Sequence, residues 1–203
     1  MLPIRKRFRS PEAHVADSNL TSILSRINPA GPGPDAPLFS TADMQRLASL
    51  PSSENQLLSL VRDNNSEQTT RFLAAEALVE GNWKEWRIQS ADRAAVARVL
   101  AEALANDASH NRWGLPGSFV GPFSKRLLSL GTEAEAALVR LLGDSRPLNI
   151  EGSEAATLNS QFHFRVSDLA SWLIATARQT PWQPSQVPSE RDAATIALRN
   201  RIR

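Results

Sequence analysis

The side chains that could transfer a proton or bind a metal are few in this sequence. Its 203 residues include three histidines and no cysteine. His14, His110 and His163 are far apart, and none belongs to the His-Glu-x-x-His spacing that holds zinc on one helix face. The lack of Cys excludes thiolate metal sites, disulfides and a Cys nucleophile. We therefore expect no bound metal and no cofactor.

Motifs for phosphate binding and acyl transfer are also missing. The glycines of residues 114–121, GLPGSFVG, have the wrong spacing for a phosphate loop or a dinucleotide fingerprint. No Gly-x-Ser-x-Gly nucleophile elbow occurs. His163 lies between two phenylalanines, which favours a partly buried turn residue over the alternative, a proton-transfer group. We expect a protein without catalytic residues.

The charged residues do not indicate a nucleic-acid-binding surface. Lys and Arg number 23 against 21 Asp and Glu, which gives a net charge of +2. The basic clusters, at residues 5–9 and 199–203, are terminal, as solvated ends are. Acidic side chains along the expected helices would repel phosphate, so nucleic acid is the disfavoured partner.

Tryptophans and carboxylates nevertheless leave one alternative open. Such side chains could serve an enzyme or enzyme subunit that acts on a nucleic acid, a nucleotide or a chromophore. The residues that would carry this alternative are Trp83, Trp86, Trp113, Trp172, Trp182, Glu151, Glu154 and Asp168.

Helical periodicity organises the chain from residue 41 onwards, because apolar residues recur at three- and four-residue spacing. Polar turns follow Asp63, Asp107 and Asp144, at steps of 44 and 37 residues. HEAT and armadillo units repeat every 40–47 residues or so. Since one helix pair buries only one face, consecutive pairs must stack to form a core. The expected helices are 41–50, 53–63, 67–80, 91–106, 119–130, 132–142, 165–178 and 190–202.

Local signals refine this picture. Ser53 with Gln56, and Thr132 with Glu135, are spaced as capping boxes that begin helices. The last expected helix has a thin apolar stripe made of Ala194, Ile196, Ala197 and Ile202.

Two strings resemble a known repeat family. AALVRLLGD at residues 136–144 and FRVSDLASWLIA at residues 164–175 resemble the helix pair of HEAT-like repeats of the bilin-lyase type. The resemblance covers about residues 54–180 and extends to a bacterial group of HEAT-like proteins of uncharacterised role. It implies an all-α, HEAT/armadillo-like superhelix of about three helix pairs. It also implies that Asp144 and Arg165 hydrogen-bond between repeats. Arg165 and Asp168 are spaced i, i+3 on the expected helix, which predicts a structural ion pair that also ties the repeats together.

The domain organisation has two parts. Residues 1–37 are expected to form an N-terminal arm, with a short amphipathic helix at 18–28 followed by a Pro-rich linker. That helix either packs on the domain or docks on another protein. Residues 38–203 are expected to form the HEAT-like repeat domain. No apolar run approaches the roughly 20 residues of a membrane span, and no apolar stretch follows the basic start as in a secretory signal. We expect a cytoplasmic protein.

The 20-residue connection at 145–164 departs from the repeat and is the expected binding surface, because insertions in solenoids map to one edge. Its alternative role is a ledge that covers the helix ends through Leu148, Ile150 and Leu158. Trp113 either plugs the second unit or is an interface hot spot. The candidate partner-binding residues are Trp113, Arg146, Glu151, Glu154 and His163.

The sequence therefore predicts a non-catalytic protein-binding module: a scaffold, an adaptor or an immunity-type inhibitor. Its partner is expected to be another protein. The partner's identity and the oligomeric state are left open.

Overall fold

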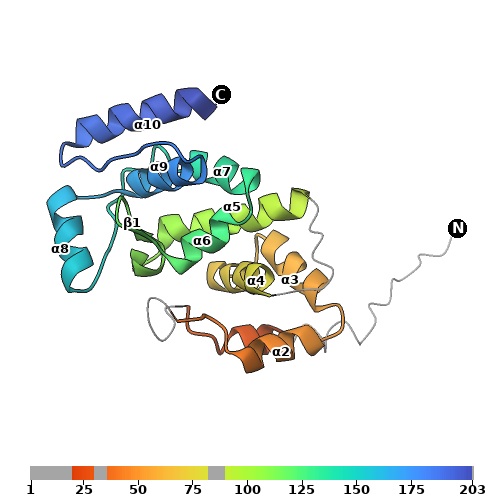
Figure 1. Cartoon of the computed structure of the whole chain (residues 1–203). Coiled ribbons are helices and arrows are strands. Elements are labelled where there is room, and N and C mark those ends of the chain that lie inside the picture. The colour runs from red at the N-terminus through yellow and green to blue at the C-terminus, as the bar shows by residue number, and fades with distance from the viewer. Residues whose placement is uncertain (1–19, 30–35, 82–89, 203) are drawn as a thin grey trace, which may run out of the picture.

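The computed structural model describes residues 20–29, 36–81 and 90–202. It is mostly helical (Figure 1), which confirms the coarse prediction of a helical protein. The helices are α2 (Thr41–Ser49), α3 (Ser53–Arg62), α4 (Gln68–Glu80), α5 (Ser90–Asn106), α6 (Pro122–Leu128), α7 (Thr132–Val139), α8 (Ser153–Phe162), α9 (Val166–Ala177) and α10 (Pro188–Ile202). A short 3₁₀ helix, η1, spans His110–Arg112.

A two-strand hairpin replaces the start of the helix expected at 119–130. Strands β1 (Gly114–Leu115) and β2 (Phe119–Val120) pair antiparallel, with Gly114 opposite Val120. Helix α6 therefore begins only at Pro122, whose fixed φ suits the first helical turn.

The capping boxes expected at Ser53 and Thr132 are absent, because another residue occupies each N-cap. Ser52 is the N-cap of α3, with a left-handed φ of 52°, and Gly131 is the N-cap of α7, with a φ of 70°. Neither makes a side-chain cap.

The helices pack in two rows. Helix α5 lies between α3 and α7 and contacts both, while α6 contacts both α4 and α9. Contacts of α3 with α4, of α5 with α6 and of α7 with α9 join the rows. Helix α2 contacts α3, and α10 packs on α9, so α2 and α10 lie towards opposite ends in Figure 1.

One hydrophobic core runs through this arrangement. Residues 20–24 are helical, and Leu20, Ile23 and Leu24 are buried in that core. Leu38 and Phe39, beyond the Pro-rich segment, are buried there too. This first helix thus packs on the rest of the molecule, while the proposed boundary at residue 37 stays a prediction.

The connection at 145–164 is only partly irregular, since it contains α8. Its first part is extended: Pro147 forms an antiparallel bridge with Arg165, and the Leu148 N–H donates to the Phe164 carbonyl at 2.8 Å. Leu148 and Ile150 are buried and Leu158 is half-buried. The segment therefore covers the core with one side and presents its polar side chains on the other.

Of the apolar stripe predicted for the last helix, Ile202 is half-buried and packs against the core, but the other three residues are not part of the buried face. The buried face of α10 consists of Arg191, Thr195 and Leu198. Ala194, Ile196 and Ala197 face solvent. The reason is an ion pair that draws Arg191 inward, as described below.

Candidate functional site

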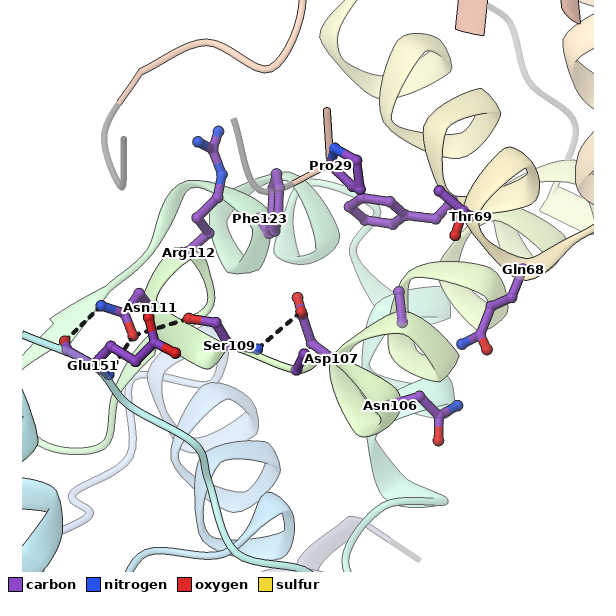
Figure 2. A pocket seen from close by; sticks show the side chains of 13 residues that line it. Pro29, Gln68, Thr69, Asn106, Asp107, Ser109, Asn111, Arg112, Phe123 and Glu151 are labelled. Carbon is purple, nitrogen blue, oxygen red and sulfur yellow. Dashed lines mark hydrogen bonds between the residues drawn. The ribbon is translucent and has the colours of Figure 1, made fainter. Parts of the chain in front are cut away.

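A groove with a volume of about 510 Å³ opens between α4, the end of α5, η1 and the start of α6 (Figure 2). Segments far apart in sequence line it, from the chain before the Pro-rich segment to the start of the 145–164 connection. The lining residues are Pro29, Gln68, Thr69, Phe72, Ala103, Asn106, Asp107, Ala108, Ser109, Asn111, Arg112, Phe123 and Glu151.

Aromatic rings form the base of the groove. Phe72 and Phe123 meet edge to face with centroids 5.1 Å apart, and Trp113 packs edge to face on Phe123 at 5.3 Å. The Arg112 guanidinium lies 4.6 Å from the centroid of the Phe123 ring and donates to the Ala36 carbonyl at 2.6 Å. The base is thus apolar, with one stacked cation at its edge.

The hairpin holds these rings in place through a close backbone approach. The Gly121 N–H donates to the Trp113 carbonyl at 3.1 Å. A Cβ at Gly121 would lie only 2.2 Å from the Arg112 carbonyl oxygen. Glycine is required here by space, and it allows α6 to start beside η1 with Phe123 pointing into the core.

Asp107 is fixed by two donors. Its Oδ2 accepts from the Trp113 indole Nε1 at 2.7 Å, and its Oδ1 accepts from the Ser109 N–H at 3.2 Å. Trp113 is 0% exposed. Trp113, the predicted hot spot, therefore offers no surface to a partner. Its role is to orient Asp107 from beneath the groove.

Asn111 holds the rim on the opposite side. Its Nδ2 donates to the Glu151 carbonyl at 2.7 Å, and its Oδ1 accepts from the Glu151 N–H at 2.8 Å. The side-chain amide thus pairs with a backbone unit as a neighbouring strand would. The Glu151 carboxylate is left exposed on the rim.

His110 joins the start of the 145–164 connection to α5. Its Nδ1 accepts from the Asn149 N–H at 3.0 Å, so its Nε2 carries the proton and donates to the Leu104 carbonyl at 3.1 Å. The His110 N–H also donates to the Asn149 carbonyl at 2.7 Å. Burial lowers the pKa of His110, although Asp107 raises it. The neutral ring is therefore a structural clamp.

Arg146 lies beside the groove. Its Nη2 donates to Asp144 at 2.6 Å and its Nη1 donates to Asn106 at 2.9 Å. The Arg146 hydrogen bond lowers the pKa of Asp144. Asp144 is thus paired with Arg146, and its carbonyl accepts from the Ser167 N–H at 3.0 Å. The expected Asp144–Arg165 side-chain bond is not found among the residues that the structure describes.

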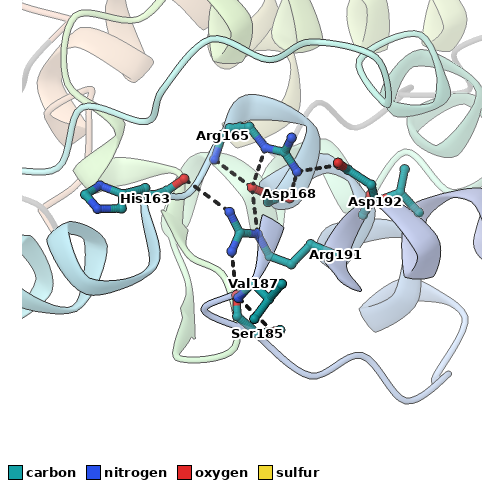
Figure 3. Close-up of polar contacts among 9 residues, drawn as sticks. His163, Arg165, Asp168, Ser185, Val187, Arg191 and Asp192 are labelled. Atoms are coloured by element: carbon teal, nitrogen blue, oxygen red, sulfur yellow. Dashed lines mark hydrogen bonds and ion pairs between the residues drawn. The ribbon is translucent and has the colours of Figure 1, made fainter. Parts of the chain in front are cut away.

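Arg165 belongs to a separate network between α9 and α10 (Figure 3). Its Nη2 donates to Asp168 at 3.0 Å and to Asp192 at 2.6 Å. The Asp168 carboxylate also accepts from the Arg165 N–H at 2.9 Å, at the start of α9. Arg191 completes the network, with its Nε 3.1 Å from the Asp168 Oδ2.

The other two predicted binding residues lie away from the groove. Glu154 is exposed in the first turn of α8. His163 is exposed at the C-cap of α8, with φ at 50°, and its carbonyl accepts from Arg191 at 3.3 Å. Of the five candidates, the structure places Glu151 on the rim, Arg146 beside it and Trp113 beneath it.

Sequence reasoning missed the residues that build the groove, above all His110, Asn111 and Phe72. The available signal was the run Ser109-His110-Asn111, whose side chains readily hydrogen-bond to backbone groups. Trp83, Trp86, His14 and the basic residues 5–9 lie outside the described residues.

A buried charged cluster lies behind the groove. Glu76 is fully buried, and its Oε2 accepts from the Arg126 Nη1 at 2.9 Å. Burial raises the pKa of Glu76 to about 8, although Arg126 lowers it. This carboxyl has no access to a ligand in the groove, so it serves the contact of α4 with α6.

Within the described ranges, no group of three or more His, Asp or Glu side chains is placed to hold a metal ion. None of the described helices is both long and apolar enough to cross a membrane. Comparison of the chain with protein-family models, with curated proteins and with solved structures finds no match.

Proposed function

We propose that the protein is a non-catalytic protein-binding module that holds a segment of a partner protein in the groove of Figure 2. One observation carries the proposal: the groove has an aromatic base and a polar rim, and the Asn111 and Asp107 side chains of the rim are already hydrogen-bonded within the protein. Such a surface can bury an apolar side chain of the partner and exclude water around it.

The polar groups of the rim support binding over chemistry. A general base needs a free lone pair aimed at the substrate, and a nucleophile needs such a base beside it. Each oxygen of the Asp107 carboxylate accepts one hydrogen bond, from Trp113 and from Ser109, which fixes its orientation, and the Asn111 amide is used by the Glu151 backbone. These bonds fix the shape of the rim before a partner arrives, which reduces the entropy lost on binding.

The proposal extends to the fold, as a HEAT-like α-solenoid. The row of α3, α5 and α7 and the row of α4, α6 and α9 support it, because consecutive helix pairs of a solenoid stack in this order. In this arrangement the groove lies at the turn of the second helix pair, between α5 and α6. Scaffold, adaptor and immunity-type inhibitor are the roles that such a module fills.

The partner segment is expected to insert an aromatic or branched aliphatic side chain between Phe72 and Ala103. Its flanking polar groups would then lie near Gln68 and Glu151 on the two sides of the rim. A cationic flanking residue suits the exposed Glu151 carboxylate.

Affinity capture from the native host, with quantitative mass spectrometry, tests this function. Thr69 is exposed on α4 and lines the groove, so Thr69→Trp fills the groove with an indole ring. Gln45→Trp adds the same ring on the exposed face of α2 and is the matched control. We expect the same partner with wild type and Gln45→Trp, and its loss with Thr69→Trp. Equal capture by all three proteins, or no enriched partner with wild type, would reject the proposal.

A further inference from the structure

Helix α10 presents one face that none of the residues the structure describes covers. Its buried face contacts α9 through Arg191, Thr195 and Leu198. The opposite face is exposed along its whole length, and Ile196 at its centre is 61% exposed, more than any other large apolar side chain described. The residues of this face are Ser189, Ala193, Ile196, Ala197 and Asn200. We call it the outer face of α10.

The outer face is shaped for another helix. The side chains on either side of Ile196 are small, so a second helix can approach closely while Ile196 fills the space between the two backbones. A lone exposed Ile needs no explanation, so the partner is argued from the charges that flank the outer face.

Charges flank the outer face in a symmetric pattern. Glu190 and Arg201 are eleven residues apart, about three helical turns, so they share one edge. Asp192 and Arg199 are seven residues apart, about two turns, and share the other edge. Both edges are acidic towards the start of the helix and basic towards its end.

The two charge pairs have the same midpoint. It lies between residues 195 and 196 for Glu190 and Arg201, and also for Asp192 and Arg199. A two-fold axis that is perpendicular to α10 and lies beside this midpoint relates α10 to an antiparallel second copy. Glu190 then faces Arg201 of the second copy, and Asp192 faces Arg199 of the second copy, on both edges at once. A parallel pairing would place like charges opposite each other instead.

We propose that the protein self-associates as a two-fold dimer through antiparallel pairing of α10, with a second copy of the same chain as the occupant of the outer face. The self-complementary charges determine both the partner and its orientation, as an isologous interface requires. In the part of the chain that the structure describes, Glu190, Arg199 and Arg201 take part in no ion pair, while Asp192 pairs with Arg165 at 2.6 Å.

The anchoring of α10 makes this face rigid. Arg191 is held by Asp168, by the carbonyl of Ser185 and by the carbonyl of His163. Ser171 and Thr195 share a buried hydrogen bond of 2.8 Å one turn further along. Helix α10 is thus fixed to α9 by its buried face, and its outer face is exposed to solvent. The dimer does not involve the groove, so the two proposals stand or fall separately.

Sedimentation velocity of the full chain, from micromolar to several hundred micromolar protein, tests the dimer. We expect a concentration-dependent monomer–dimer equilibrium at low salt, because a single helix pair makes a small interface. Ile196→Glu is expected to leave a monomer at every concentration. Its circular dichroism should match that of wild type, since Ile196 is exposed.

Charge reversal tests the orientation. Glu190→Arg alone should raise the dissociation constant about tenfold, because the two-fold axis doubles each lost pair. Arg201→Glu alone should do the same, and the double variant Glu190→Arg/Arg201→Glu should restore wild-type association. A double variant as weak as the singles would overturn the antiparallel arrangement. A wild-type protein that is monomeric throughout, or one that dimerises as well with Ile196→Glu, would overturn the proposal.

The absence of Cys in the sequence provides a further control. Ile196→Cys places the only thiols beside the two-fold axis and should form a disulfide-linked dimer under mild oxidation. Ala48→Cys, exposed on α2, should form no disulfide-linked dimer under the same conditions. Equal cross-linking of the two variants would show random collision and contradict the dimer.

Discussion

Arg191 of α10 lies against Asp168 of α9, with its Nε 3.1 Å from Oδ2, and the two residues are only 2% and 0% exposed. Asp168 also accepts from Arg165, which reaches Asp192 on α10. The carboxylate therefore joins the start of one helix to the side of the next. Because both charges are buried, removal of Asp168 leaves Arg191 without a counter-charge, and removal of Arg191 leaves Asp168 with Arg165 as its one remaining ion-pair partner among the described residues.

Loss of the Arg191 side chain is expected to destabilise the protein strongly. Arg191→Ala leaves Asp168 buried with Arg165 alone and opens a space beside Phe164, whose ring centroid lies 5.5 Å from the guanidinium carbon. The free energy of unfolding should fall by about 3 to 5 kcal/mol. Urea denaturation followed by circular dichroism measures it. Arg199→Ala, on the exposed side of the same helix, should change it by less than about 0.5 kcal/mol.

The His110 clamp predicts a specific pH dependence. The folded protein holds the neutral ring, because burial lowers the pKa of His110 below the 6.5 of an unfolded chain. The unfolded state therefore takes up a proton first as the pH falls. The stability that the protein gains from the neutral His110 ring is complete above pH 6.5. It is lost as the pH falls towards the lower pKa that His110 has in the folded protein.

Unfolding free energies measured between pH 7.5 and pH 5 check the clamp. The unfolding free energy of wild type minus that of His110→Gln should decrease as the pH falls across that window, because the raised pKa of Glu76 gives both proteins the same opposite slope. His110→Gln should also start from a lower value. His163→Gln, which alters an exposed ring, should keep the wild-type profile. If His110→Gln retained the full pH dependence, another group would be responsible.

Glycine at position 121 is expected to be necessary for the hairpin beside the groove. Gly121→Ala places a Cβ against the Arg112 carbonyl oxygen, 2.2 Å away, so the backbone must shift. Overpacking of this kind costs about 1 to 3 kcal/mol, which thermal unfolding would detect. Gly143→Ala is the matched control, since nothing lies within 4 Å of its added Cβ. Equal effects of the two substitutions would contradict the close approach.

The Asn111 amide should control the order of the groove rim. In wild type the amide protons of Asn149 and Glu151 are bonded to His110 and Asn111. Asn111→Ala should speed hydrogen exchange at Glu151 by about tenfold, and it should leave Asn149 protected. Exchange monitored residue by residue by NMR gives the answer. Unchanged exchange at Glu151 would show that the rim does not depend on Asn111.

Helices with a strong apolar period could be predicted from the sequence. The expected bounds of the helix at 67–80 lie within one residue of α4, and those of the helix at 91–106 lie within one residue of α5. Helix α8 was missed because no strong apolar stripe marks SEAATLNSQF. The hairpin was missed because strands of two residues leave no period to detect.

Features that depend on long-range contacts could not be predicted. A charged residue is expected to face solvent. The burial of Arg191, and with it the choice of which face of α10 packs on α9, follows only from the position of Asp168. The groove combines Pro29, Thr69 and Glu151, which become neighbours only when α4, η1 and the 145–164 connection are in place. Glu151 was identified because it is polar in an insertion, whereas Phe72 was hidden among the core residues of its helix.

Site-specific photo-cross-linking in the native host tests the central claim, binding of a partner segment in the groove, most directly. A photoreactive amino acid at Thr69 faces the groove, and the same group at Gln45 faces solvent from α2. We predict one dominant adduct with another protein from position 69, carried by a single peptide of that protein, and no such adduct from position 45. The account would be contradicted if position 69 gave no adduct, or the same scattered adducts as position 45.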